Sequence, residues 1–465
     1  MHQDNFEISI DDMSKIEGHA SLEVKVRKGE VKDVKLKVFE NRRFFELAVR
    51  GKNYAAVPQL VSRICGTCSA SHMMCSIKCI ENALGVEPSE QTAMLRDLTT
   101  YGVNIRDHAM HLFLFVLPDL FGKDSILQFS DSGYEHDLLH KALDIKAAGN
   151  LLSTEVGGRT VHPPFPAVGS FLHVPSKDKT KVLVAELRKV RESAIEFVHL
   201  FAEKDSRFDI PDIDFIAMSN KDYSFVNGGL CMHSSGYCIP EHAFERFFKE
   251  RVVPYSQATG FSFQGKPYMV GALARMNINV TSLHKDTRKD MTEDNLFPSF
   301  NIYHNNLAQA IEIVHCIDTS VELLEKCEFR QEPVMKIEPK ESEGVGVVEA
   351  PRGTLFYHGK LDKAGTMTYA NLVIPTAQNN VLMEKAVGML VQKCLGEDKT
   401  KVQIQHEVET LIRAFDPCMS CATHFLKVKW DEAGRRAVNG QNARRRFVSS
   451  ELLQQLDDSQ PEGWE

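Results

Sequence analysis

The sequence predicts a mainly α-helical protein with small β-sheets, an α+β fold built around a long central helix bundle. Apolar residues recur at helical spacing over many long stretches, which is the main sequence signal of amphipathic helices. These stretches are residues 41–50, 74–84, 90–121, 134–151, 178–208, 241–255, 302–327, 379–395 and 402–415. Polar and apolar residues alternate instead in 20–39 and 353–374, which indicates small sheets beside the helices.

The strands and the breaks between helices have their own signals. Residues 20–39 alternate on both sides of a Lys28-Gly29-Glu30 turn, so we expect a β-hairpin with one apolar face. The 90–121 stretch is long and rich in His, Leu and Phe, which is typical of an inner helix of a bundle. The 134–151 helix is expected to end at Gly157-Gly158. We expect short strands in 209–238, a polar loop in 256–300 and an acidic connector in 338–347.

Composition limits the classes of protein to consider. A chain of 465 residues can bury a large core. Its net charge of −8 argues against nucleic acid as the main partner, because nucleic-acid binding favours a basic surface. No apolar run approaches a membrane span in length, so we expect no direct membrane insertion. The N-terminus lacks the character of a signal peptide, and eleven cysteines suit a reducing compartment. We therefore expect a cytoplasmic protein.

Two short cysteine motifs lie near opposite ends of the chain, Arg63 to His72 (RICGTCSASH) and Asp416 to His424 (DPCMSCATH). Each places two thiols three positions apart, and two such pairs give a complete donor set for a metal that prefers sulfur. A structural zinc site is the plain alternative. Structural zinc pairs usually staple a small module, whereas most of this large chain separates these two pairs. The charged and ionisable companions also exceed what a closed structural site requires.

The two motifs, in this order, resemble the two signatures of the large subunit of nickel–iron hydrogenases, and the resemblance extends from about residue 13 to residue 424. It implies a catalytic subunit that cleaves H2 heterolytically and reversibly into protons and electrons. It also implies a single interwoven domain over residues 1–424 with the helix bundle of that family. Two alternatives stay open: a hydrogen-sensing subunit, and a non-catalytic redox subunit like the quinone-site subunit of respiratory complex I, which lacks the cysteines.

The resemblance assigns the metal ligands. Cys65, Cys68, Cys418 and Cys421 match the four thiolates that bind nickel, with Cys68 and Cys421 bridging to an iron that carries carbon monoxide and cyanide. Thiolates are soft donors that the metal keeps deprotonated. A terminal thiolate can also accept a proton from dihydrogen, which makes Cys418 a candidate catalytic base.

Further motifs match residues around that centre. Glu17 lies in KIEGH, which resembles the family's RIEGH, whose glutamate relays protons; alone, such a glutamate is more often a solvated turn residue. Arg352 lies in EAPRG, where the family places a guanidinium over the open metal face. The plain alternative is that Arg352 pairs with Glu349. Asp107 and Asp416 match two carboxylates that orient the arginine, although Asp-Pro alone signals a turn.

The remaining matches concern the ligands of iron and a second metal. Pro375 and Thr376 resemble the segment that contacts a cyanide ligand, and His72 resembles a histidine beside a bridging cysteine. Glu46 and His424 match ligands of a second metal, magnesium or iron, although Glu46 could equally be a surface residue. The stretch 157–163 resembles another segment of the family and is expected to be scaffold around the path of the clusters. Cys75 and Cys79, at helical spacing after that motif, are expected to be core residues.

The C-terminal extension and the lack of electron-carrier motifs in the sequence imply partner proteins. Residues 425–465 resemble the C-terminal extension that a maturation protease removes after nickel-insertion proteins have loaded the site, with cleavage expected between His424 and Phe425. The sequence has neither a dinucleotide-binding or phosphate-binding glycine loop nor an iron–sulfur cysteine run. We therefore expect an iron–sulfur small subunit, and further electron-transfer subunits leading to a soluble acceptor.

Overall fold

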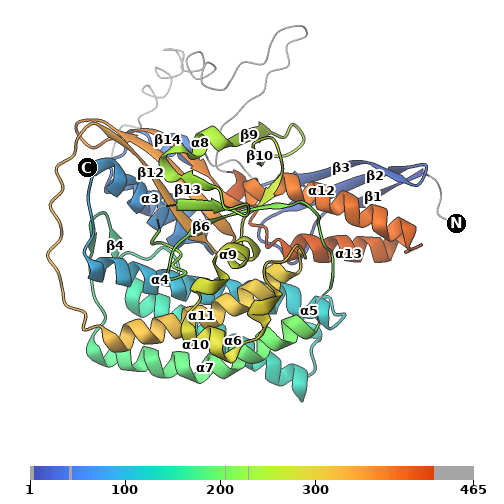
Figure 1. The fold of residues 1–465 in the computed structure, drawn as a ribbon, viewed down its shortest axis with the longest axis horizontal. Coiled ribbons are helices and arrows are strands. Elements are labelled where there is room, and N and C mark those ends of the chain that lie inside the picture. Colours follow the sequence, from blue (N-terminus) through green and yellow to red (C-terminus); the bar gives the residue numbers. More distant parts are fainter. Residues whose placement is uncertain (1–4, 41–43, 205, 229, 424–465) are drawn as a thin grey trace, which may run out of the picture.

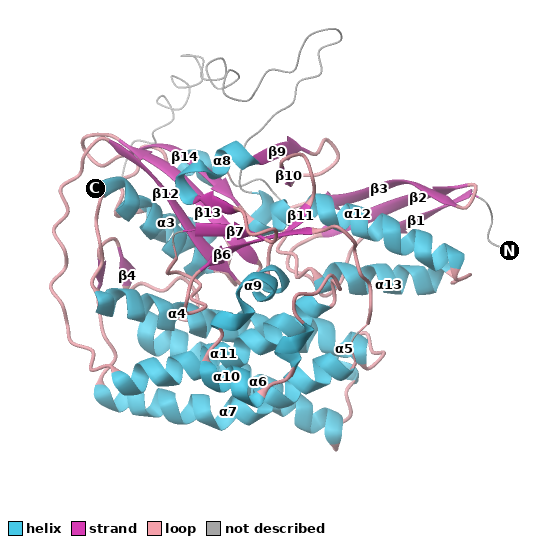
Figure 2. Ribbon diagram, viewed as in Figure 1, coloured by secondary structure: helices cyan, strands magenta, loops and turns pink. Residues whose placement is uncertain are grey.

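The computed structural model describes residues 5–40, 44–204, 206–228 and 230–423. A layer of long helices lies below a layer of small sheets and their covering helices, and a third group of elements projects to one side (Figures 1 and 2). The prediction of a mainly helical protein with small sheets and a central bundle is confirmed. None of the described helices is both long and apolar enough to span a membrane.

Four long helices form the bundle, and each packs against two of the others. They are α4 (Glu90–Ala109), α6 (Tyr134–Gly157), α7 (Lys177–Glu203) and α11 (His304–Lys326). Ser89 and Ser176 cap α4 and α7, because each hydroxyl accepts a hydrogen bond from the backbone N–H of the third helical residue. Gly158, with φ of 91°, ends α6 in the left-handed region that glycine adopts without strain.

The helix predicted over residues 90–121 is interrupted. After α4 the backbone forms a π-helix over Met110–Val116 and then α5 (Leu117–Leu120). Single π-helical turns shift the register of side chains and occur often at functional sites. Here the π-helix contains His111, whose ring bonds Gln309 of α11 and the backbone carbonyl of Arg413.

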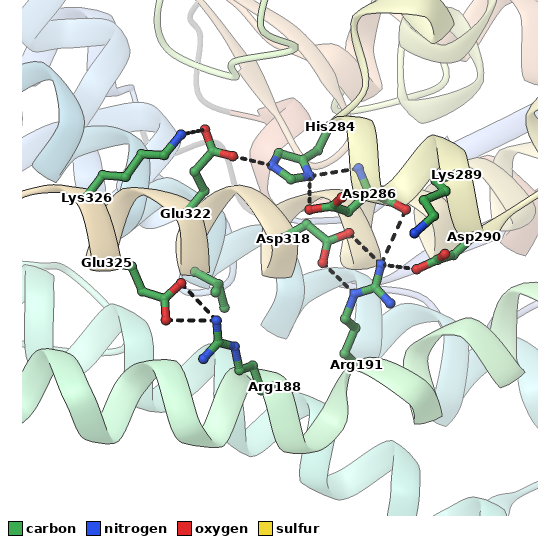
Figure 3. A pocket seen from close by; sticks show the side chains of 11 residues that line it. Arg188, Arg191, His284, Asp286, Lys289, Asp290, Asp318, Glu322, Glu325 and Lys326 are labelled. Atoms are coloured by element: carbon green, nitrogen blue, oxygen red, sulfur yellow. Dashed lines mark hydrogen bonds and ion pairs between the residues drawn. The ribbon is translucent and has the colours of Figure 1, made fainter.

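A charged cleft joins α10 (Lys285–Asp290) to the bundle (Figure 3). Arg191 of α7 bonds Asp318 of α11 at 2.6 Å and Asp290 of α10 at 2.8 Å. Arg188 pairs with Glu325 at 2.8 Å, so the cleft is crossed by ion pairs between neighbouring helices. These contacts fix helix positions on the side of the bundle formed by α7, α10 and α11.

The central sheet consists of antiparallel strands in the order β12 (Ser342–Ala350), β13 (Gly353–Leu361) and β14 (Met367–Val373). Helix α3 (Ser69–Leu84) packs directly on β12. Gly344 and Gly346 make this approach possible, because a Cβ on Gly346 would lie 2.3 Å from the backbone oxygen of Cys75. The two glycines are two positions apart and therefore face the same helix.

The projecting group is a three-stranded sheet covered by two helices (Figure 1). Its strands are β1 (Asn5–Ile10), β2 (Ala20–Arg27) and β3 (Glu30–Val38), and its helices are α12 (Pro375–Gly396) and α13 (Lys401–Ala414). The predicted β2–β3 hairpin pairs Val24 with Val34 and buries Leu22, Val24 and Val26 on one face. Strand β1 adds an edge that we did not expect.

The other elements are short. They are α1 (Phe45–Ala48), α2 (Val57–Val61), β4 (Pro166–Ala167), β5 (Ser170–Phe171), β6 (Asp214–Ser219), β7 (Leu230–His233), β8 (Cys238–Pro240), α8 (Phe244–Phe247), β9 (Phe248–Val252), β10 (Thr259–Phe263), β11 (Tyr268–Met269) and α9 (Ala272–Asn279). Strands β11, β6, β7 and β8 form one sheet, β9 and β10 a second, and β4 and β5 a third.

Three local predictions were wrong. The helix expected over 241–255 stops at Phe247, because the chain then pairs with β10 and its phenylalanines stack on Phe356, 4.8 Å from the Phe244 ring and 5.2 Å from the Phe248 ring. The loop expected over 256–300 contains β10, β11, α9 and α10. The connector expected over 338–347 ends at 341, because strand β12 of the central sheet begins at the next residue.

Replacing Gly346 with Ala tests the close packing of α3 on the sheet. The added methyl would collide with backbone atoms of Cys75 and Cys79, so we expect destabilisation by about 2–3 kcal/mol. A lower melting temperature in calorimetry would show it. Gly396→Ala is the control, because no heavy atom lies within 4 Å of that added methyl, and its effect should stay within about 0.5 kcal/mol. Equal melting temperatures for the two variants would contradict the packing.

Candidate metal centre

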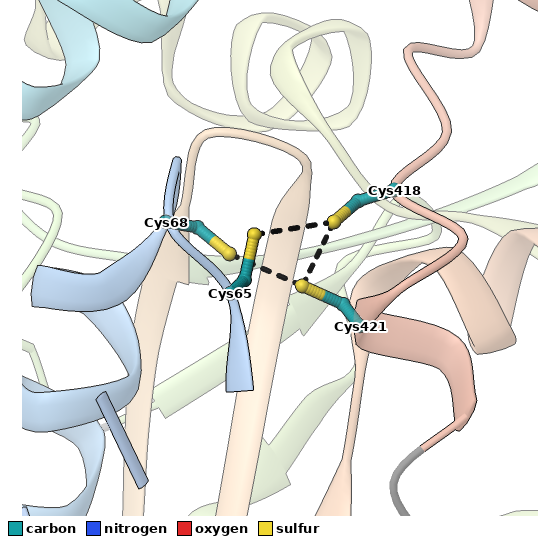
Figure 4. Close-up of side chains that lie close together, drawn as sticks. All are labelled: Cys65, Cys68, Cys418 and Cys421. Atoms are coloured by element: carbon teal, nitrogen blue, oxygen red, sulfur yellow. Dashed lines mark hydrogen bonds between the residues drawn. The ribbon is translucent and has the colours of Figure 1, made fainter. Parts of the chain in front are cut away.

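The two cysteine pairs meet in the interior (Figure 4). Their four sulfur atoms all lie within 4.8 Å of one another. The Cys65 and Cys418 sulfurs are 3.5 Å apart, those of Cys68 and Cys421 are 3.2 Å apart, and those of Cys418 and Cys421 are 2.9 Å apart. All four side chains are buried. Four soft donors converging on one point are suited to a thiophilic metal.

Helix α4 holds the first cysteine loop in place. The Arg106 guanidinium donates hydrogen bonds to the backbone carbonyls of Thr67 and Thr160. Ser69 Oγ accepts a bond from the His162 backbone N–H at 3.0 Å. The stretch 157–163 thus lies against the first motif. Helix α4 can approach α6 closely because Gly149 has no side chain; a Cβ there would lie 2.7 Å from the Arg106 backbone nitrogen.

The KIEGH segment holds the second cysteine loop. Glu17 and Cys418 form a parallel bridge in which the Met419 N–H donates to the Glu17 carbonyl at 2.9 Å. The Glu17 carboxylate lies 3.0 Å from the Cys418 sulfur and accepts a bond from the Ser420 N–H at 3.1 Å. Gly18, with φ of 81°, is needed here, because a Cβ would lie 2.9 Å from that of Met419. Burial and the Cys65 charge raise the pKa of Glu17.

Polar side chains from two other elements contact the cysteines, one at a thiol and one at the backbone. His72 of α3 places Nε2 3.5 Å from the Cys421 sulfur, and its Nδ1 bonds the Tyr357 hydroxyl of β13 at 2.7 Å. Thr376, at the second position of α12, accepts a bond from the Cys418 backbone N–H at 2.9 Å. Pro375 starts this helix without needing an amide hydrogen and lines the same small cavity as the sulfurs.

Arg352 lies across this cavity between two carboxylates. Its Nη1 donates to Asp107 of α4 at 2.7 Å, and its Nη2 lies 2.9 Å from Asp416 Oδ1. Burial disfavours the charged guanidinium, but the two carboxylates outweigh it and raise the pKa of Arg352, so the side chain stays cationic. Asp416 has φ of 48°, a strained conformation for a residue with a side chain.

Glu349 does not pair with Arg352, so the plain alternative for that arginine was wrong. Its Oε2 accepts a hydrogen bond from Arg275 Nη1 at 3.0 Å, and its Oε1 accepts bonds from the Met218 N–H and the Thr354 hydroxyl. Arg275 was missed as a site residue by sequence analysis, because it lies in the 256–300 stretch that was expected to be a loop. Gln309 and Glu312 were also missed; their helical spacing from Asn305 in the 302–327 stretch was the available signal.

The pocket lining fits a nickel–iron centre with small polar ligands. The cavity adjoins Cys68, Cys418 and Cys421. Arg352 Nε is a buried donor with no hydrogen-bond partner among the described residues. Asp107 Oδ1 is a buried acceptor that likewise has no partner among them. Buried polar atoms are normally paired, so these atoms indicate room for a further polar group beside the thiols.

The second-metal prediction falls partly outside the described residues, because His424 is not among them. Glu46 of α1 is buried, and its Oε1 accepts a bond from the Leu372 N–H of β14 at 3.1 Å. It is therefore not the surface residue that was the alternative. Cys75 and Cys79 are core residues: their thiols donate to strand carbonyls of Gly346 and Gly344, and burial raises the pKa of Cys79 to about 12.

A buried set of four thiols with an adjacent carboxylate and a fixed guanidinium is the arrangement of a catalytic metal centre. The nickel-dependent hydrogenase family model matches residues 43–129 and 241–424, and the chain belongs to this family. It is an oxidoreductase that acts on H2, and the four-cysteine cluster makes it the catalytic large subunit of a nickel–iron hydrogenase. The zinc and complex I-like alternatives are thereby set aside.

Known relatives span the chain almost fully. Sulfhydrogenase 1 subunit alpha and sulfhydrogenase 2 subunit alpha of Pyrococcus furiosus are 34% and 32% identical over 90% of this chain, covering 98% and 100% of their own lengths. The NAD-reducing hydrogenase HoxS subunit beta of Cupriavidus necator is 29% identical over 90% of this chain and 94% of its own length. A crystal structure of an NAD+-reducing [NiFe]-hydrogenase has the same fold, with a TM-score of 0.77, 24% identity, and coverage of 91% of this chain and 100% of that one.

Serine substitutions distinguish metal ligands from core cysteines. Cys68→Ser should lower the nickel content of the purified protein by about tenfold or more, because a hydroxyl is a poor soft-metal ligand at neutral pH. Cys79→Ser, in the same helical region, should retain nickel, because its thiol only donates to a strand carbonyl. Metal analysis per chain measures both. Similar nickel contents in the two variants would contradict the assignment of the site.

Proposed function

We propose that this chain splits H2 reversibly and heterolytically, with Cys418 and Glu17 as the first two proton carriers. The observation that carries the proposal is the 3.0 Å contact between the Cys418 sulfur and the half-buried Glu17 carboxylate. Cys65, Cys68, Cys418 and Cys421 would hold the nickel–iron centre, which would supply Lewis acidity and electron-accepting capacity. Each H2 thereby gives two protons and two electrons.

Glu17 is suited to pass a proton onward. Its raised pKa brings the protonated form closer to neutral pH, which matches a group that must both accept and release a proton. Its backbone carbonyl accepts a bond from the Met419 N–H and its carboxylate accepts one from the Ser420 N–H, so its distance from the Cys418 thiol is fixed. The Glu17 side chain is half-buried, so it lies between the buried Cys418 thiol and the outside of the chain.

Arg352 is proposed to act as a fixed cation at the open face of the centre, oriented by Asp107 and Asp416. A preorganised guanidinium stabilises developing negative charge in a dry cavity more strongly than water does. The unpaired Arg352 Nε supports cyanide as one of the iron ligands, because a cyanide nitrogen is a hydrogen-bond acceptor; carbon monoxide is proposed beside it from the resemblance alone. Pro375, Thr376 and His72 would complete the surroundings of those ligands.

A second metal, magnesium or iron, is proposed at Glu46 and His424. A buried carboxylate on α1, beside the central sheet, is the kind of hard oxygen donor that such a cation prefers. This cation would tie the N-terminal region to the end of the second cysteine motif.

Electrons are proposed to leave through an iron–sulfur small subunit and further electron-transfer subunits toward a soluble acceptor in the cytoplasm. The relatives are named as subunits alpha or beta of sulfhydrogenases and of an NAD-reducing hydrogenase, which supports a multi-subunit assembly. The four-cysteine cluster is the only group of three or more potential metal ligands among the described residues, so iron–sulfur clusters have to come from elsewhere.

Glu17→Gln tests the proton path. The amide keeps the shape but cannot carry the proton, so we expect nickel content to be retained and H2-dependent dye reduction to fall on the order of 100-fold. The measurement compares rate per bound nickel in the purified complex. Glu23→Gln on the exposed face of β2 is the control and should leave the rate unchanged. A Glu17→Gln enzyme with full activity would exclude this path.

Removal of residues 425–465 is proposed to complete maturation, assisted by nickel-insertion proteins and a protease. These residues and His424 lie outside the described part of the structure. Intact-mass spectrometry of the nickel-loaded protein should show a chain that ends at His424, and the nickel-free protein should retain the full length. A nickel-loaded, active chain that still ends at Glu465 would contradict the proposal.

A further inference from the structure

Helix α11 carries a buried polar stripe, which we define as Asn305, Gln309 and Glu312. The spacing of four and three residues places all three side chains on one face of the helix. Their exposed fractions are 2%, 0% and 0%. A stripe of amide and carboxylate groups inside a bundle is destabilising unless each group is bonded, so its partners show what it is for.

Glu312 is bonded to the peptide units that precede Arg352 through one intermediate side chain. Arg275 of α9 donates to both oxygens of Glu312, at 2.6 and 2.7 Å. The same guanidinium donates to the backbone carbonyls of Ala350 at 2.9 Å and Pro351 at 3.0 Å. The turn that presents Arg352 to the metal cavity is therefore held by a buried, bidentate ion pair.

Glu312 also reaches the carboxylate that orients Arg352, from the other side. Its Oε2 lies 2.8 Å from His108 Nε2, and His108 directly follows Asp107 in α4. Arg352, Asp107, His108, Glu312 and Arg275 thus form a closed ring of hydrogen bonds and backbone links that returns to Pro351. Burial alone would raise the pKa of Glu312, but Arg275 holds it at about 2, so this carboxylate stays ionised.

Gln309 and Asn305 hold the second carboxylate and its backbone. Gln309 Nε2 donates to Asp416 Oδ2 at 2.9 Å, and its Oε1 lies 2.6 Å from His111 Nδ1. Asn305 donates to the Ala414 carbonyl at 2.9 Å and accepts from the Leu273 N–H at 2.9 Å. These bonds help to hold Asp416 in its left-handed backbone conformation, which is strained for a residue with a side chain.

We propose that the polar stripe of α11 positions Arg352 over the metal centre: Glu312 fixes the backbone before it and the segment of Asp107, and Gln309 fixes Asp416. The inference rests on the proposed role of Arg352. It makes Glu312, Arg275 and Gln309 positioning residues that contact neither the thiols nor the cavity. One helix thereby controls both carboxylates, and small displacements of a catalytic group have large effects on rate.

A double-mutant cycle tests whether Glu312 acts through Arg352. Glu312→Gln and Arg352→Lys are made singly and together in the matured complex, and H2 oxidation is measured per bound nickel. We expect Glu312→Gln alone to lower the maximal rate on the order of 10- to 100-fold with nickel content retained. In the Arg352→Lys background it should lower the rate by less than about twofold, because the guanidinium it positions is already gone.

The matched control is Glu322→Gln on the same helix. Glu322 pairs with His284 and Lys326 in the charged cleft (Figure 3) and takes no part in the ring. The Glu322→Gln variant should therefore oxidise H2 at the rate of the unmodified enzyme. A crystal structure of the Glu312→Gln protein gives a second readout that does not depend on activity. The Arg352 guanidinium should be displaced from Asp107.

Three results separate the possible failures. If Arg352→Lys leaves the rate unchanged, the proposed function of Arg352 is wrong. If Arg352→Lys lowers the rate but the rate losses of the two substitutions multiply in the double variant, the positioning role is wrong. It is also wrong if Arg352 keeps its place in the crystal structure of the Glu312→Gln protein. If Glu312→Gln prevents nickel loading, the same cycle with Gln309→Met decides, because that substitution removes only the bonds to Asp416 and His111. Multiplicative effects there would overturn the proposal.

Discussion

The meeting of four thiols from opposite ends of the chain is the constraint on which the rest of the structure depends. The Cys65 and Cys418 sulfurs are separated by 353 residues and lie 3.5 Å apart. No local interaction can produce that contact, so the elements that carry the two loops must be placed precisely. Helix α3 is seated on β12 by the glycine contacts, and α13 ends directly at the second loop. Glu17 then joins the second loop to the N-terminal sheet.

Charge is buried around this contact in a repeated arrangement. Arg352 lies between Asp107 and Asp416, and behind it Arg275 bonds Glu312 and Glu349. Each arginine faces two carboxylates, so removing the arginine leaves both carboxylates buried without a counter-charge, which typically destabilises a protein by about 3–5 kcal/mol. Such a network gives little net stability but allows few alternative arrangements. It therefore suits a site where the position of one guanidinium matters more than its binding energy.

The sequence predicted those features that depend on local spacing or on a recognisable motif. The long helices followed from apolar periodicity, and the cysteines, Glu17, Asp107, Arg352 and Asp416 came from the resemblance to a known family. The structure brings all of these residues to one cavity or its margin. Their individual roles stay predictions that the substitutions above address.

The features that sequence reasoning missed depend on distant contacts. Phe244 and Phe248 fit a helical period, but pairing of their segment with β10 and stacking on Phe356 decide the backbone. Arg275 lay in a polar stretch that gave no sign of α9, and its partners Glu312 and Glu349 are 37 and 74 residues away. Buried polar networks of this kind become visible only when the fold has brought their members together.

The central claim is that the four thiols hold a nickel–iron centre at which H2 is split. An infrared spectrum of the anaerobically matured protein, in the region of triple-bond stretching, tests it most directly. The account predicts bands from metal-bound carbon monoxide and cyanide in a protein that contains both nickel and iron. A spectrum without such bands from a protein that contains both metals would contradict the claim, because the four thiols would then hold a different centre.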